Sequence, residues 1–188
     1  MSDKQNKKNN NVFSRRGFTL LELMASIAII GIMTGVGLAS LSSAKRHYAL
    51  KTAQEEVTSA IKLAQSYALQ GRGVAGVEKV CGYKFVFTNS STYAIYYYTM
   101  SGQNCTGSIN INNSTQVVET QTLKNGVTLS SPAVSNTIIF FTIPNAKISG
   151  VGVSKTFTFT VGTGSSAESK KIIVSSTGLV SEVKATQD

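Results

Sequence analysis

The sequence has few of the side chains on which catalysis depends. It contains one histidine, His47, and nine acidic residues in 188. A lone histidine beside Arg46, next to an apolar run, is more typical of a solvated or interfacial residue than of a ligand, and no Ser-His-Asp set can be built around it. The acidic residues after position 70 lie far apart, without calcium-loop or paired-carboxylate spacing. Phosphate-loop, dinucleotide and nucleophile-elbow motifs are also missing. The sequence therefore predicts a protein that is not an enzyme, without cofactor or metal.

Charge is nearly absent from one long segment. Phe18–Ala44 spans 27 residues, and Glu22 is its only charged side chain. A helix of about 20 residues already crosses the roughly 30 Å hydrocarbon core of a bilayer. A core helix of this length would be too long for so small a domain. We therefore expect residues 18–44 to form a transmembrane helix in contact with membrane lipid.

The segment before this run is basic. Met1–Gly17 carries five lysines and arginines against Asp3, a net charge of +4 out of the chain's +9. The positive-inside rule predicts that residues 1–17 stay in the cytoplasm, with the C-terminal part across the membrane. The apolar run lacks an internal signal-peptidase site. Gly17 is the only small residue at the junction of the charged and apolar segments, so a cut there would leave the apolar helix on the mature chain.

The segment Lys45–Gln70 has no glycine or proline, and its apolar residues recur every three or four positions. This spacing predicts an amphipathic helix with one apolar stripe. The stripe comprises Leu50, Ala53, Val57, Ala60, Ile61, Ala64 and Ala68. Gly71–Gly73 should end the helix, and Phe18–Gln70 should then be one nearly continuous helix. Within it, Gly31, Gly35 and Gly37 are the expected sites of bending or close helix packing.

Residues 74–188 change to period-two patterns typical of strands. The expected strands are Gly82–Phe87, Thr92–Tyr98, Thr115–Leu123, Asn136–Ile143, Lys155–Val161, Lys170–Ser176 and Gly178–Lys184. Alternation of apolar and polar residues, as in "FTFT", is typical of antiparallel sheets that have one face exposed to solvent. The predicted fold class is α+β: a long N-terminal helix, transmembrane and then amphipathic, packed on an antiparallel β-sandwich-like head. The expected divisions are 1–17, 18–44, 45–73 and 74–188.

The chain has two cysteines, Cys81 and Cys105. Export of the head permits a disulfide between them. In the chain-entropy model such a bond stabilises the fold by about 3 kcal/mol. Two reduced, buried thiols are the alternative.

Glu22 needs a partner, because a carboxylate at the centre of a bilayer costs about 2.5–3.5 kcal/mol on insertion scales. If the bond after Gly17 is cut, Phe18 gains a free amine four residues away. Within one helix the two groups meet only loosely. Between staggered neighbouring copies, the amine of one could neutralise the carboxylate of the next. Our hypothesis is that Glu22 marks the register of helix assembly.

The stretch "RRGFTLLELMASIAIIGI" resembles the N-terminal signal of type IV prepilins and type II secretion pseudopilins. The matching positions are Gly17, Phe18, Thr19, Leu20, Leu21 and Glu22. The resemblance implies a pilin fold, cleavage after Gly17 by a prepilin peptidase, and N-methylation of Phe18 by the same enzyme. It also implies partners: other pilins or pseudopilins, the peptidase and an inner-membrane assembly platform.

The stretches "AQEEVTSAIKLAQSYALQGRG", "IIFFTIPNAKISG" and "KKIIVSSTGLVSEVK" are similar to GspH/FimT-type minor pseudopilins. Two departures stand out. Many pilins have a proline where this chain has Ala39, and the calcium-binding loop of major pseudopilins is missing, which favours a minor component. The resemblance implies a single-pass protein of the inner membrane, with its N-terminus inside and its head outside, that later enters a filament.

Two functions follow from the resemblance. The first is a structural subunit that helps to prime or cap a type II secretion pseudopilus or type IV pilus. The alternative is a DNA-binding minor pilin for DNA uptake, since some FimT-like relatives bind DNA. DNA binding would need a basic patch with aromatic side chains. The candidates in this chain are Lys170, Lys171 and the tyrosines of Tyr93–Tyr98.

Overall fold

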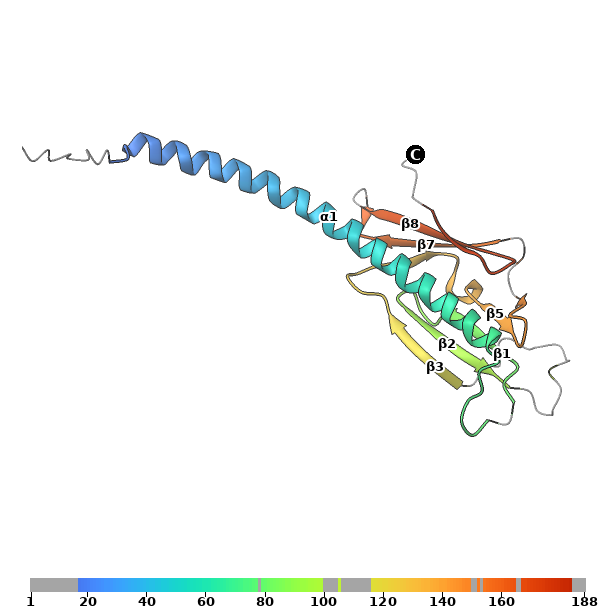
Figure 1. Cartoon of the computed structure of the whole chain (residues 1–188). Coiled ribbons are helices and arrows are strands. Elements are labelled where there is room, and N and C mark those ends of the chain that lie inside the picture. Colours follow the sequence, from blue (N-terminus) through green and yellow to red (C-terminus); the bar gives the residue numbers. More distant parts are fainter. Residues whose placement is uncertain are drawn as a thin grey trace, which may run out of the picture. The chain divides into compact units, whose positions relative to one another are not determined.

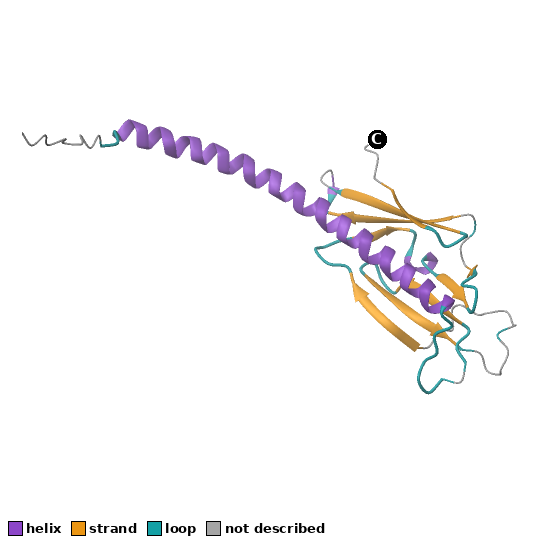
Figure 2. Ribbon diagram, viewed as in Figure 1, coloured by secondary structure: helices purple, strands orange, loops and turns teal. Residues whose placement is uncertain are grey.

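The computed structural model describes residues 17–77, 79–99, 105, 116–149, 152, 154–164 and 167–183. The expectations for the basic leader at 1–16 and for Lys184 lie outside the described residues. The chain divides into two compact units, Met1–Ser42 and Ser43–Asp188. Figures 1 and 2 show the elements of both units.

The N-terminal element is a 50-residue helix, α1 (Leu20–Leu69), which confirms the predicted helix to within two residues at each end. Its C-terminus forms a Schellman motif. The amide of Arg72 donates to the carbonyl of Tyr67 at 3.1 Å, and that of Gly71 donates to Ala68 at 3.2 Å. Gly71 has a φ of 57°, in the left-handed region. Because glycine adopts this conformation without a Cβ penalty, Gly71 ends the helix at the predicted turn.

The head contains two antiparallel sheets. The first has the order β3-β2-β1-β5-β6 and the second the order β4-β7-β8-β9. The strands of the first are β1 (Gly82–Phe87), β2 (Thr92–Tyr98), β3 (Gln116–Thr122), β5 (Ile139–Thr142) and β6 (Ile148–Ser149). Those of the second are β4 (Thr128–Ser131), β7 (Ser154–Val161), β8 (Glu168–Ser175) and β9 (Val180–Val183). The fold is therefore the expected α+β arrangement of a long helix and an antiparallel head.

The sequence misplaced or missed three elements. The strand expected at Asn136–Ile143 starts only at Ile139, after the 3₁₀ turn η1 (Val134–Asn136). The reason is Thr137, which is buried and whose hydroxyl donates to the carbonyl of Val134 at 2.8 Å and accepts from the amide of Phe87 at 2.9 Å. Strands β4 and β6 were missed because four and two residues are too few to show alternation.

The core of the head lies between the sheets and under the second half of α1 (residues 45–69; the first half is residues 20–44), which runs along them in Figure 1. Phe157 of the second sheet meets Phe85 and Phe87 of the first, and Phe159 meets Phe87, with ring centroids 6.2–6.3 Å apart. Tyr93 packs on Phe85 and Phe87 within the first sheet, with centroids 5.5 and 5.6 Å apart. Such spacings suit edge and offset ring packing. The predicted stripe of α1 covers this cluster: Leu50, Ala53, Val57, Ile61, Ala64 and Ala68 are each at most 2% exposed, while Ala60 is half-buried.

Candidate functional site

The first half of α1 carries its apolar side chains on the outside. The exposed ones include Leu20, Leu21, Leu23, Met24, Ile27, Ile29, Ile30, Ile32, Met33 and Val36. Among the described residues, α1 is the one helix whose length and composition would allow it to cross a membrane. A helix that is apolar on all sides suits a lipid environment rather than the surface of a soluble domain, where one face of the helix contacts water.

Two hydroxyl groups in this half, those of Ser26 and Thr34, are bonded within the helix. Ser26 donates to the carbonyl of Glu22 at 2.7 Å, and Thr34 donates to that of Ile30 at 2.8 Å. These bonds, each to the residue four positions earlier, satisfy the hydroxyls without water. Inside a bilayer this is a requirement, because water is absent there.

The start of α1 gives Glu22 a local setting that sequence reasoning missed. Thr19 is the N-cap residue, and its hydroxyl accepts a hydrogen bond from the Glu22 amide at 3.2 Å. Glu22 is then the third helical residue, where the positive end of the helix dipole stabilises a carboxylate. The sequence signal was present: "TLLE" has the Thr-x-x-Glu spacing of a capping box.

Residues at the predicted processing and packing positions are open to their surroundings. The exposed fraction of Phe18 is 82%. Apart from its chain neighbours and the helix's own backbone, a Cβ built at Gly17, Gly31, Gly35 or Gly37 would meet no atom within 4 Å. No contact within the described part of the chain therefore requires glycine at these four positions.

In the head, Cys81 and Cys105 form a disulfide, with Cα atoms 5.5 Å apart. Cys81 is buried beside Tyr98 and Phe140, and Cys105 packs half-buried against them. The bond ties residue 105 to the start of β1. It closes a loop that contains all of β1 and β2, so it restrains the central hairpin of the first sheet.

The residues at the junction of the two halves of α1 have structural partners. Arg46 pairs with Glu168 of β8 at 3.4 Å, and the hydroxyl of Ser43 donates to the same carboxylate at 3.4 Å. His47 is exposed, and its ring contacts that of Tyr48. Among the described residues, no group of three or more histidines, cysteines or acidic residues is placed to hold a metal ion.

The structure does not bring the proposed DNA-contacting residues together as a stacking surface. Tyr93, Tyr97 and Tyr98 are each at most 9% exposed and belong to the core. Tyr96 is half-buried, with the Lys84 ammonium 5.0 Å from its ring centroid. Base stacking needs exposed ring faces, which these buried tyrosines do not offer. Lys170 is half-buried and Lys171 is exposed, both on β8.

Two families match this chain. Residues 13–38 match the family described as the prokaryotic N-terminal methylation motif, and residues 53–178 match the family described as type II transport protein GspH. Among solved structures, the chain is similar to the type IV minor pilin FimU of Pseudomonas aeruginosa strain PAO1. That similarity has 14% sequence identity and a TM-score of 0.49, over 73% of this chain and 98% of the other. A search of curated proteins found no match.

Proposed function

The chain belongs to the GspH family of type II transport proteins, and from this we propose that it helps to prime or cap a secretion pseudopilus or type IV pilus. Members of this family are structural, non-enzymatic minor pseudopilins of the type II secretion and type IV pilus systems. The observation that supports a filament role most strongly is α1 itself: a 50-residue helix that is apolar and exposed in its first half and buried as a stripe in its second.

Processing is the first step of this role. We propose that a prepilin peptidase cuts after Gly17 and methylates the new amine of Phe18. The match to the N-terminal methylation motif over residues 13–38 supports this, because it contains both residues. Residues 18–44 would then form the transmembrane and assembly segment. Residues 45–73 would continue the helix into the head formed by residues 74–188.

The proposed topology places residues 1–17 in the cytoplasm, the first half of α1 in the inner membrane and the head outside. The exposed apolar side chains of that half support the placement. The disulfide of the head supports it as well, because such bonds persist in oxidising compartments. From the membrane the protein would enter the filament.

Assembly would use the first half of α1. Gly31 and Gly35 are four residues apart and so lie on one helix face, where missing side chains let two helices approach closely. Glu22 would face the Phe18 amine of a staggered neighbour. The partners would be other pilins or pseudopilins, the inner-membrane assembly platform and membrane lipid.

The test is to express the full chain with and without a prepilin peptidase and a set of partner pseudopilins. With the peptidase, intact-mass analysis should give a chain that starts at N-methylated Phe18. Partner pseudopilins should co-purify with it from detergent-solubilised membranes. Gly17→Leu should leave the chain unprocessed. A full-length Met1 form in the presence of active peptidase, or the absence of every partner pseudopilin, would overturn the proposal.

A further inference from the structure

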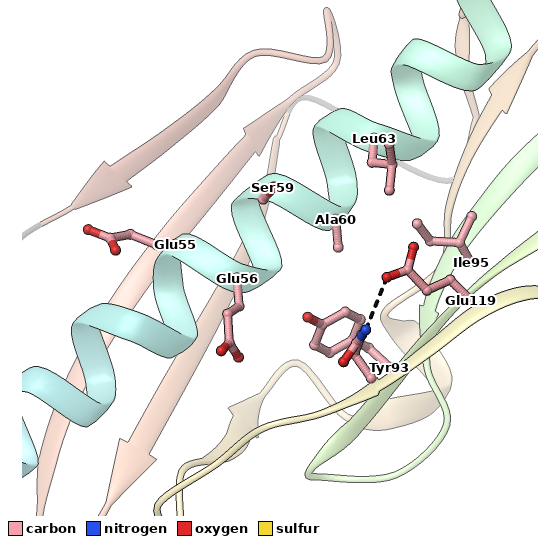
Figure 3. Close-up of a pocket in the computed structure, with 9 residues that line it drawn as sticks. Glu55, Glu56, Ser59, Ala60, Leu63, Tyr93, Ile95 and Glu119 are labelled. Carbon is pink, nitrogen blue, oxygen red and sulfur yellow. Dashed lines mark hydrogen bonds between the residues drawn. The ribbon is translucent and has the colours of Figure 1, made fainter.

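A groove of about 450 Å³ lies between α1 and the edge of the first sheet. The helix supplies one wall, β2 supplies Tyr93 and Ile95, and β3 supplies Glu119 (Figure 3). This volume is in the range of binding pockets for small groups. The groove belongs to the head, and the proposed membrane and processing functions do not use it.

The groove is acidic although the chain as a whole is basic. Glu56 of α1 and Glu119 of β3 both extend into the space between these elements (Figure 3). Glu55 lies at the rim and pairs with Lys51 on the helix surface at 3.7 Å. Glu119 accepts a hydrogen bond from Gln121 at 3.1 Å. Among the described residues, neither Glu56 nor Glu119 has a cationic partner, so both carboxylates are available to a ligand.

Tyr93 is the independent sign of a binding site. The residue as a whole is only 4% exposed to solvent, yet no described residue forms a hydrogen bond with its hydroxyl. Figure 3 shows this hydroxyl pointing into the groove, on the side of Glu56. Burial, reinforced by Glu56 and Glu119, raises the pKa of Tyr93 to about 12. The hydroxyl is therefore neutral at pH 7, and its oxygen can accept a hydrogen bond.

We propose that this groove binds the ammonium group of a lysine side chain that a neighbouring filament subunit, a pseudopilin other than this chain, presents. The inference rests on the proposed function, because it assumes that other subunits pack beside the head. It assigns the groove a partner contact that is separate from the helix contacts of Glu22 and the glycines.

The side chains that line the groove suit a lysine side chain. An ammonium group donates three hydrogen bonds in different directions. Three acceptors come from three elements: Glu56 on α1, the Tyr93 oxygen on β2 and Glu119 on β3. The apolar lining by Ala60, Leu63 and Ile95 suits the aliphatic stem of the side chain. A metal ion fits less well, because no group of three metal-ligating side chains occurs among the described residues.

Zero-length carbodiimide crosslinking tests this contact, because it joins a carboxylate to an amine only where the two touch. The full chain is expressed with its partner pseudopilins and crosslinked in membranes, and the crosslinked peptides are identified by mass spectrometry. We expect amide links from Glu56 or Glu119 to a lysine of another pseudopilin. The Lys51–Glu55 pair inside α1 is the internal control for reagent access.

Two variants test the site with different readouts, the crosslink yield and the co-purification of the partner. Tyr93→Phe keeps the buried ring and both glutamates but removes the third acceptor, so the crosslink yield at Glu56 and Glu119 should fall several-fold. Glu56→Lys should lower co-purification of the partner at least tenfold, and Lys→Glu at the crosslinked partner lysine should restore it. Glu182→Lys, the same charge reversal on the exposed surface of β9, is the matched control and should change neither quantity.

The outcomes separate this inference from the proposed function. If partner pseudopilins co-purify but Glu56 and Glu119 form no link to them, the groove contact is wrong and the filament role survives. Links only to a second copy of this chain would also overturn the neighbouring-subunit contact. An unchanged yield in Tyr93→Phe, together with no charge-swap rescue, would refute the three-acceptor site. If no pseudopilin co-purifies with the wild type, the proposed function itself fails.

Discussion

The two halves of α1 are both helical and both rich in apolar residues, but they meet different surroundings. In the first half Ile27, Ile32 and Val36 are 63–71% exposed. In the second half Leu50 and Ile61 are at most 1% exposed. The difference follows from the sequence pattern. Apolar residues on every side of a helix cannot all be buried by one sheet, whereas a single stripe can. The first half of the helix therefore suits contact with lipid or with neighbouring helices, whereas the second half packs against the head of the same chain.

Glu22 is the exception in the first half, and changing it should have the largest effect. Glu22→Val should leave membrane insertion intact or easier, because it removes the cost of burying a carboxylate. The head should fold as before, since it forms a separate compact unit. Co-assembly with other pseudopilins should be lost, because the Phe18 amine of a neighbour loses its counter-charge. Co-purification of partners at matched expression measures this.

Glu22→Gln separates two roles of Glu22: a charge contact with a neighbouring subunit, and the capping of the α1 N-terminus together with Thr19. Glutamine serves the third helical position of a capping box as well as glutamate does, but it carries no charge. If the charge acts between subunits, Glu22→Gln should fail to assemble as Glu22→Val does. Assembly at the wild-type level would show that helix capping explains the residue and that the register hypothesis is wrong.

A matched pair of truncations sharpens the contrast between the two halves. Ile61→Ala should lower the free energy of unfolding of the head by about 3 kcal/mol, because it leaves a cavity in a packed core. Ile32→Ala removes the same atoms from an exposed position and should leave it unchanged. Denaturant unfolding of the full chain in mild detergent, followed by tyrosine fluorescence, measures both. All seven tyrosines lie between residues 48 and 98, so the signal reports on the head. A comparable loss in Ile32→Ala would mean that the two halves are not independent.

The sequence predicted the helix well because its signals are local. The apolar run, the stripe and the glycines at 71 and 73 all lie within the segment that they define. The head was harder, because strand identity depends on distant partners. β6 is a strand only because Phe140 and Phe141 pair with Ser149 and Ile148. The structure also revealed Tyr93, one of the proposed DNA-stacking tyrosines, as a core residue.

The groove was out of reach of sequence reasoning for a similar reason. Glu56 and Glu119 are 63 positions apart, and only the pairing of β3 with β2, beside α1, brings them together. Their spacing along the chain carried no motif. The N-cap at Thr19 is the opposite case, since its signature lay within four residues and was overlooked.

Two buried threonines should respond in opposite directions to the same substitution. Thr58 lies on the second half of α1, is 7% exposed, and its hydroxyl has no hydrogen-bond partner among the described residues. Thr58→Val keeps the shape and removes that buried hydroxyl, so the free energy of unfolding should rise by about 1 kcal/mol. Thr137→Val should lower it by about 2 kcal/mol, because the Phe87 amide loses its acceptor. Unfolding curves in which both variants shift the same way would contradict this account.

The smallest effect is expected where the two halves of α1 meet, at the Arg46–Glu168 pair. Both side chains are about one third exposed, at 34% and 32%, and their atoms are 3.4 Å apart. Water and salt screen such a pair, so its coupling should be about 0.5 kcal/mol. A double-mutant cycle with Arg46→Met and Glu168→Gln measures that coupling. Methionine keeps an apolar stem in place of the arginine stem, so the measured change in free energy reflects the lost charge and not lost packing. The coupling should vanish in 1 M salt. A coupling above 2 kcal/mol that persists in salt would contradict a screened surface pair. It would mean that Glu168, which also accepts a hydrogen bond from Ser43, fixes the start of the second half of α1 on the head.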